Sequence, residues 1–125
     1  MTDYQAPVRQ MRFTIEHLAD FAAVAALPDF SAVDGDTVQA VLEEAAKFAS
    51  GVLGPINWLG DQQGVQVVND AVQVPQEFTD AYRQFCAAGW PGIASNPDFG
   101  GQGLPKTVAL ACDEMWAAAN VSFAL

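Results

Sequence analysis

The chain has 125 residues, the size of one ordinary domain. Hydrophobic residues make up 51% of it and charged residues 16%, so it can bury enough apolar surface to offset the entropy lost on ordering, and disorder is excluded for most of the chain. Its net charge of −10 would repel a phosphate backbone and an anionic lipid surface, which argues against nucleic acid as a partner and against a basic membrane patch.

The N-terminal segment is expected to be extended. Residues 1–13 contain charged side chains and no apolar core segment, so they predict no signal peptide, and no stretch of the chain has the composition of a membrane span. Pro7 disfavours helix at the residue before it. We therefore expect an extended strap over residues 1–13, followed by one helical domain over residues 14–125.

Two helices are predicted in the first half of this domain. Thr14 is a candidate N-cap of the first, which Pro28 would end. Asp36 is a candidate N-cap of the second, in which apolar residues recur at helical spacing from Val38 onward. Because proline lacks a backbone donor, we expect the Gly54-Pro55 pair to stop or kink this helix, and residues 56–64 to be irregular.

The second half of the chain predicts a hairpin and two more helices. Valines flank Asn69-Asp70, which indicates a short hairpin near residues 65–74. Pro75 suits the start of a third helix and Gly89 its end, and Pro105 opens a fourth helix. The fold class is therefore predicted as all-α, with about four main helices and a short β-hairpin.

The two cysteines, Cys86 and Cys112, both fall in predicted helices. A pair without metal-ligand spacing is typical of reduced, buried thiols, and we expect a cytoplasmic protein. His17 is the single histidine and neither CxxC nor HExxH occurs, so no metal ligand is expected.

Few residues suggest a catalytic or ligand-binding role. The glycines of residues 100–103 could cradle a phosphate, but the GxxxxGK[ST] and GxGxxG patterns are absent and a tight turn is the favoured interpretation. The adjacent Asp113 and Glu114 point apart on a helix and are expected to be solvated. The three tryptophans are expected to be core or interface anchors. No serine lies in a GxSxG pattern, and the residues alone predict no catalytic constellation.

Several segments, taken together and in order, resemble a known family. The most specific is 99–105 (FGGQGLP); it is preceded by 4–7 (YQAP), 41–49 (VLEEAAKFA) and 72–75 (VQVP), and followed by 118–123 (AANVSF). These segments resemble the start of the flavin-dependent acyl-CoA dehydrogenases, in the bacterial long-chain subgroup with an N-terminal extension that includes methylthiopropanoyl-CoA dehydrogenases. Members often have glycine where this chain has Ala71 and Gln76, which affects turn geometry only.

The resemblance implies a reaction that this chain does not complete alone. The full enzyme would oxidise an acyl-CoA to its trans-2-enoyl-CoA, with a glutamate taking the α-proton and FAD accepting a hydride, and would pass electrons to an electron-transfer flavoprotein. The resemblance also implies a homo-oligomer. The catalytic glutamate and the main flavin contacts would lie beyond Leu125, so we expect no catalytic and no cofactor-binding residue in this chain, and an inactive fragment.

The family position of the last segment implies one possible site. The helix through Asn120, Val121, Ser122, Phe123 and Ala124 would approach the fatty acyl chain, and its small and apolar side chains suit such a wall. These five residues are our substrate-pocket candidates. Ordinary core packing is the competing interpretation for each of them.

The end of the chain leaves two classes of function open. Residues 117–125 have no capping glycine and no polar tail, so we expect the chain to be the front portion of a longer protein, with apolar surface where other domains would pack. The alternative is a free-standing helical module that binds another protein or an apolar ligand.

Overall fold

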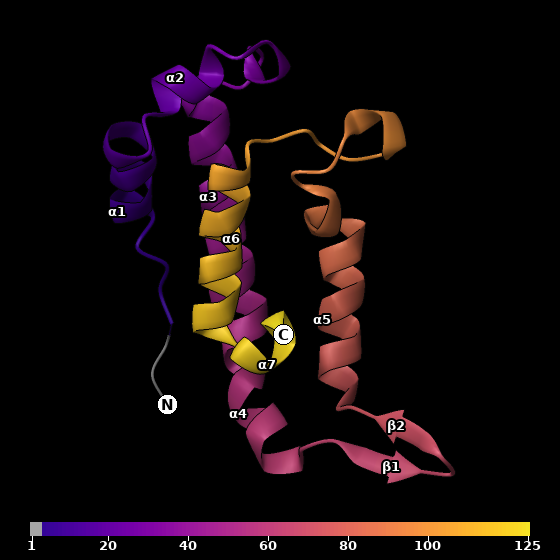
Figure 1. Cartoon of the computed structure of the whole chain (residues 1–125). Helices are drawn as coiled ribbons and strands as arrows, with labels where there is room; N and C mark the ends of the chain where they lie inside the picture. Colours follow the sequence, from indigo (N-terminus) through magenta and orange to yellow (C-terminus); the bar gives the residue numbers. More distant parts are fainter. Residues whose placement is uncertain (1–3) are drawn as a thin grey trace.

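The computed structural model describes residues 4–125 and is mainly helical (Figure 1). Within these residues, four helices have ten residues or more: α3 (Gly35–Phe48), α4 (Gly54–Gln63), α5 (Gln76–Ala87) and α6 (Lys106–Ala119). The shorter elements are α1 (Val8–Phe13), α2 (Phe21–Ala25), α7 (Val121–Ala124), β1 (Gln66–Val68) and β2 (Ala71–Gln73). The all-α prediction with about four main helices and a short hairpin is confirmed.

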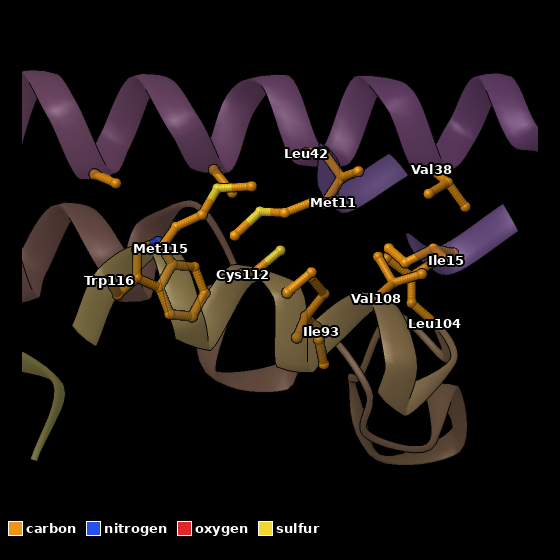
Figure 2. Packing of buried hydrophobic residues seen from close by; sticks show 14 of the residues in the cluster. Met11, Ile15, Val38, Leu42, Ile93, Leu104, Val108, Cys112, Met115 and Trp116 are labelled. Carbon is orange, nitrogen blue, oxygen red and sulfur yellow. The ribbon is translucent and has the colours of Figure 1, made fainter. Parts of the chain in front are cut away.

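The core lies between α3 and α6, which run side by side (Figure 1), and α1 covers part of it from the outer side. Val108, Cys112 and Met115 of α6 face Leu42 of α3 across this interface (Figure 2), and all four side chains are fully buried. Their spacing of three to four residues along α6 follows the helical period.

The N-terminal segment differs from its prediction. Residues 8–13 form α1, so the expected extended strap is wrong there, and residues 1–3 lie outside the described part of the chain. Thr14 does not cap a helix, because α1 continues into a π-helical turn, Thr14–Leu18. Pro7 restricts only the residue before it, and the helix that follows buries Met11 and Ile15, four residues apart.

The first predicted helix is also divided. Asp20 has a left-handed backbone (φ 50°), which separates the π-helical turn from α2, and its carboxylate accepts a hydrogen bond of 3.4 Å from the backbone N–H of Ala23. A short acidic side chain tolerates this conformation and caps the helix that follows, so the chain turns at Asp20.

The N-cap of α3 is Asp34, whereas the sequence pattern favoured Asp36. The Asp34 carboxylate accepts hydrogen bonds of 2.7 Å from the hydroxyl and from the backbone N–H of Thr37, and the Thr37 hydroxyl is the main cause of the lowered pKa of Asp34.

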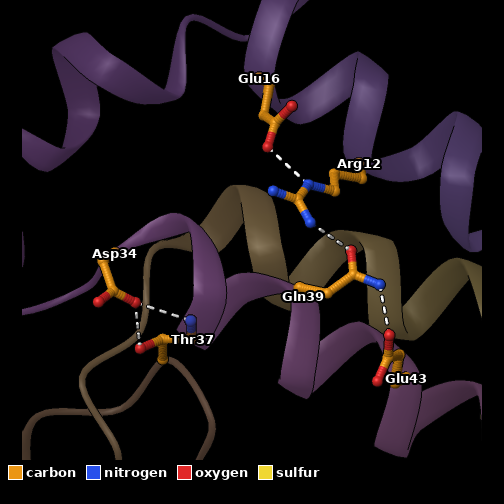
Figure 3. A network of polar contacts seen from close by, with 6 residues as sticks. All are labelled: Arg12, Glu16, Asp34, Thr37, Gln39 and Glu43. Carbon is orange, nitrogen blue, oxygen red and sulfur yellow. Dashed lines mark hydrogen bonds and ion pairs between the residues drawn. The ribbon is translucent and has the colours of Figure 1, made fainter.

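Nearby, Arg12 pairs with Glu16 at 2.6 Å and donates to Gln39 at 3.0 Å, which ties α1 to α3 (Figure 3).

The helix does not stop at Gly54-Pro55. A π-helical turn, Ala49–Leu53, joins α3 to α4, and the backbone N–H of Gly54 donates to the carbonyl of Ala49. The wider turn places the donor-free Pro55 in the first turn of α4, where an N–H is not needed. The helix therefore continues to Gln63, and the prediction of irregular chain over residues 56–64 is wrong up to that residue.

The other turns follow their predictions. Asn69 and Asp70 have positive φ angles of 51° and 60°, the conformation of a tight hairpin turn, and Val67 pairs with Val72 across the antiparallel strands. Gly89 adopts a left-handed backbone (φ 79°) after α5. Pro105 directly precedes α6.

Candidate functional site

The predicted pocket segment is not one continuous helix. α6 ends at Ala119, the backbone of Asn120 is extended (φ −160°, ψ 91°), and α7 begins at the next residue. The Asn120 side chain is 1% exposed. Its Oδ1 accepts a hydrogen bond of 3.2 Å from the N–H of Phe123, and its Nδ2 donates at 3.1 Å to the carbonyl of Leu53. Because Asn120 caps α7, the expectation of a helix running through it is wrong.

Two grooves flank α7. The first, here called the α4 groove, has a volume of about 890 Å³ and is lined by Tyr4, Gln5, Gly54, Asn57, Trp58, Gly60, Asp61, Ala118, Ala119, Val121 and Ser122. The second, the α5 groove, has a volume of about 480 Å³ and is lined by Tyr82, Phe85, Asp113, Trp116, Ala117, Val121, Phe123, Ala124 and Leu125. α7 is thus the partition between a mixed polar groove and a groove lined mainly by apolar and aromatic side chains.

Aromatic rings build the wall of the α5 groove. The ring of Phe123 lies edge-on to the ring of Phe85, with centroids 5.6 Å apart, and 6.4 Å from that of Phe48. Phe85 in turn meets Trp116 edge-on at 4.8 Å, and Trp116 meets Trp90 at 5.4 Å. Edge-to-face pairs at these distances are favourable, so this aromatic cluster holds Phe123 and the groove wall in one arrangement.

Four of the five sequence-predicted residues line the two grooves. Val121 lines both, Ser122 lines the α4 groove, and Phe123 and Ala124 line the α5 groove. Asn120 lines neither groove and acts through its hydrogen bonds.

The sequence reasoning missed the residues on the facing walls. It placed Trp58 and Asp61 in irregular chain, whereas α4 carries both into the α4 groove, and Trp58 is 61% exposed there despite being expected to pack. Tyr82 and Phe85 of α5 line the α5 groove, where the sequence predicted only a helix. The signal that could have found α4 is the helical spacing of Val52, Ile56 and Leu59, which continues past Pro55.

The charges of the grooves limit what can bind. Asp61 lines one groove and Asp113 the other, and no Lys, Arg or His is among the lining residues. Burial, and next the charge of Glu114, raise the pKa of Tyr4, so its hydroxyl remains a neutral hydrogen-bond donor. These grooves suit an uncharged apolar or hydrogen-bonding group, and they lack the cations that a phosphate would need.

The glycine-rich loop is a structural turn. The backbone N–H groups of residues 100–104 donate, in order, to the carbonyls of Pro97, Asn96, Gly92, Ser95 and Ile93. All five donors are therefore satisfied inside the loop and do not point at a ligand, so this loop does not fit the diphosphate of a nucleotide cofactor. Gln102 closes the loop by donating from Nε2 to the carbonyl of Gly89 at 3.0 Å.

Other candidates lie apart from the grooves or on the surface. His17 is exposed and its ring centroid lies 4.7 Å from that of Phe13. Asp113 and Glu114 are exposed, as expected for a solvated helix face. Among residues 4–125, no group of His, Cys, Asp and Glu side chains is placed to hold a metal ion. In the same residues, no helix is long and apolar enough to cross a membrane.

The two cysteines are both free, and they differ in exposure. Cys112 is fully buried, as predicted, whereas Cys86 is exposed on α5, so the expectation that both are buried is wrong for Cys86. Burial, and next the charge of Asp113, raise the pKa of Cys112 to about 12.

We expect one thiol of the folded chain to react at pH 8. At this pH a thiol with a pKa of about 12 is ionised to roughly one part in ten thousand, and the thiolate is the nucleophile. A colorimetric disulfide reagent should therefore titrate Cys86 alone in the native chain and both cysteines in denaturant. The Cys86→Ser variant is the control and should give no rapid reaction; rapid labelling of Cys112 in that variant would contradict the buried environment.

Comparison with known proteins identifies relatives over nearly the whole chain. No protein-family model matches it. It is 38% identical over 122 residues to 3-methylmercaptopropionyl-CoA dehydrogenase of Ruegeria pomeroyi, a match that covers 98% of this chain and 21% of that protein. It is 26% identical over 122 residues to the broad-specificity linear acyl-CoA dehydrogenase FadE5 of Mycobacterium tuberculosis, covering 96% of this chain and 20% of that protein. The chain spans about one fifth of the length of the curated relatives it matches.

Proposed function

We propose that this chain, a homologue of part of two acyl-CoA dehydrogenases, is the N-terminal helical domain of a flavin-dependent acyl-CoA dehydrogenase. The observation that carries this proposal is the similarity of 38% identity over 98% of the chain. In the longer polypeptide the reaction is the α,β-dehydrogenation of an acyl-CoA thioester, for which FAD supplies the hydride acceptor. The residues of this chain bind and orient the acyl group and exclude water from it.

The acyl chain is proposed to lie against α7, in the α5 groove. Phe85, Trp116 and Phe123 give this groove an aromatic wall, which suits an alkyl or thioether chain because no polar group of the ligand is left unpaired. The relatives are named for a methylthio acyl-CoA and for linear acyl-CoAs, so we propose a linear acyl group as the substrate class. The phosphates of coenzyme A would bind outside both grooves, since their lining residues include no cation.

Packing on other domains is the second proposed role. Trp58, Tyr82 and Leu110 lie on α4, α5 and α6, and their side chains are 61%, 59% and 65% exposed. Large exposed apolar side chains on several helices are typical of surfaces that another protein segment covers. We propose that the remaining domains of the enzyme cover these side chains.

The proposal is tested in two steps. The gene is first read past codon 125, where the proposal expects a continuous reading frame, and the longer polypeptide is purified and assayed by dye reduction with linear acyl-CoAs. A flavin absorption band and acyl-CoA-dependent reduction are expected for the long form, and neither for the 125-residue chain. A stop codon after Leu125, or turnover by the short chain, would contradict the proposal and favour a free-standing module.

The assignment of the acyl chain to the α5 groove has its own test in the long form. Ala124 lines the α5 groove and Ser122 the α4 groove, and both side chains are exposed on the same short helix. Ala124→Phe should fill the apolar groove and raise KM for the preferred acyl-CoA about tenfold, the scale of one or two lost apolar contacts. Ser122→Phe is the matched control, with an expected change below about threefold. The opposite pattern would place the chain in the α4 groove.

A further inference from the structure

We infer that Asn120 is a positioning residue that fixes the partition between the two grooves and thereby sets which acyl chains the pocket accepts. The effect on acyl-chain selectivity rests on the proposed function. The attachment of α7 by Asn120 concerns the 125-residue chain alone. Asn120 touches no ligand groove itself. It acts through α7, whose side chains form the partition.

The geometry of Asn120 joins three elements. Its backbone N–H donates to the carbonyl of Trp116 at 2.8 Å, which completes the last turn of α6. Its side-chain Oδ1 caps α7 by accepting from Phe123, and its Nδ2 donates to Leu53, 67 residues earlier in the chain, where the π-helical turn meets α4. One buried amide group therefore ties the start of α7 to the long α3–α4 helix.

The position needs both a donor and an acceptor. An aspartate would cap α7 but offers no donor to the Leu53 carbonyl, and it would bury a charge at a site that is 1% exposed. A leucine would offer neither group. Asparagine supplies both from one planar amide, so its two hydrogen bonds hold α7 in one orientation relative to α4.

α7 depends on this attachment because it is short. It has four residues, and a helix of that length is not stable by itself. Besides the Asn120 hydrogen bonds, α7 is held by its packing on α6 and α4 and by the ring of Phe123 against Phe85 and Phe48. Val121 lines both grooves, so a rotation of α7 would enlarge one groove at the expense of the other. The Leu53 hydrogen bond opposes this rotation together with the ring of Phe123.

The first test uses the 125-residue chain and needs no substrate. In Asn120→Ser, serine keeps the N-cap but its short hydroxyl does not reach Leu53; in Asn120→Ala both hydrogen bonds are lost. Amide hydrogen exchange at Phe123 and Ala124 should quicken about tenfold in Asn120→Ser and more in Asn120→Ala, the scale expected for loss of one buried hydrogen bond. Ser122→Ala, an exposed change on the same helix, is the control and should leave exchange unchanged. Equal exchange in all four proteins would overturn the structural part of the inference.

The second test measures selectivity in the longer enzyme. The ratio of kcat/KM for the preferred acyl-CoA to that for a chain four carbons longer should fall about tenfold in Asn120→Ser, while kcat for the preferred substrate stays within about threefold. A role in stability alone would lower activity on all chain lengths by the same factor, and that result would overturn the inference. If the wild-type long form oxidises no acyl-CoA, the proposed function fails, and the hydrogen-exchange result still decides whether Asn120 fixes α7.

Discussion

Gly101→Ala should destabilise the chain by roughly 3 kcal/mol, because the added methyl group would occupy space filled by backbone. A Cβ built on Gly101 lies 2.6 Å from Cβ of Ser95 and closer still to its carbonyl group. That carbonyl cannot move without cost, since it accepts the N–H of Gly103 at 3.0 Å. The expected result is a thermal midpoint lower by roughly 10 °C, measured by circular dichroism at 222 nm.

Gly51→Ala is the matched control for this prediction. Gly51 lies in the π-helical turn between α3 and α4, and a Cβ there meets nothing within 4 Å. Removing a glycine from a helical position should stabilise the chain by about 0.5–1 kcal/mol. If Gly101→Ala were as stable as Gly51→Ala, the close packing of Gly101 against the Ser95 carbonyl would be wrong.

The elements that the sequence predicted correctly are set by local backbone chemistry. Gly89 ends α5 because it adopts a positive φ without steric cost, and Pro75 and Pro105 precede helices because their missing donors are not needed there. Asn69 and Asp70 form the hairpin turn for a similar reason. Each of these rules depends on one residue and its immediate neighbours, so a sequence alone is sufficient to apply them.

The errors arose where the sequence offers equivalent local choices or where contacts between distant segments decide the outcome. Asp34 and Asp36 are equally good caps by type, and Asp34 caps α3 because Thr37 donates both its hydroxyl and its backbone N–H to that carboxylate. Pro55 stops a helix by the local rule, yet here a π-helical turn accommodates it because Ala49 and Leu53 are fully buried. Local propensity is a weak prior, and at Pro55 the burial of the helix against its neighbours overrides it.

At the candidate site, the family position implied a substrate pocket at residues 120–124, and this stays a prediction. Four of these residues line grooves. The role of Asn120 could not be read from the pattern, because its amide is used by Leu53, a residue far away in the sequence. The facing residues Trp58 and Asp61 were missed for a related reason, since they reach the groove only when α4 continues past Pro55.

Leu42→Ala should cost about 3 kcal/mol, within the range for a fully buried leucine, and Leu110→Ala should cost less than about 0.5 kcal/mol. Leu42 is 0% exposed at the α3–α6 interface, where truncation removes apolar contacts and leaves a cavity, whereas Leu110 is 65% exposed on the outer face of α6. The two substitutions remove the same atoms, so the difference in urea midpoints measures burial alone.

In the longer enzyme that we propose, Leu110 would be covered by another domain, and its substitution should then become costly. A small effect of Leu42→Ala would contradict the α3–α6 core, and a small effect of Leu110→Ala in the long form would contradict packing of another domain on this face.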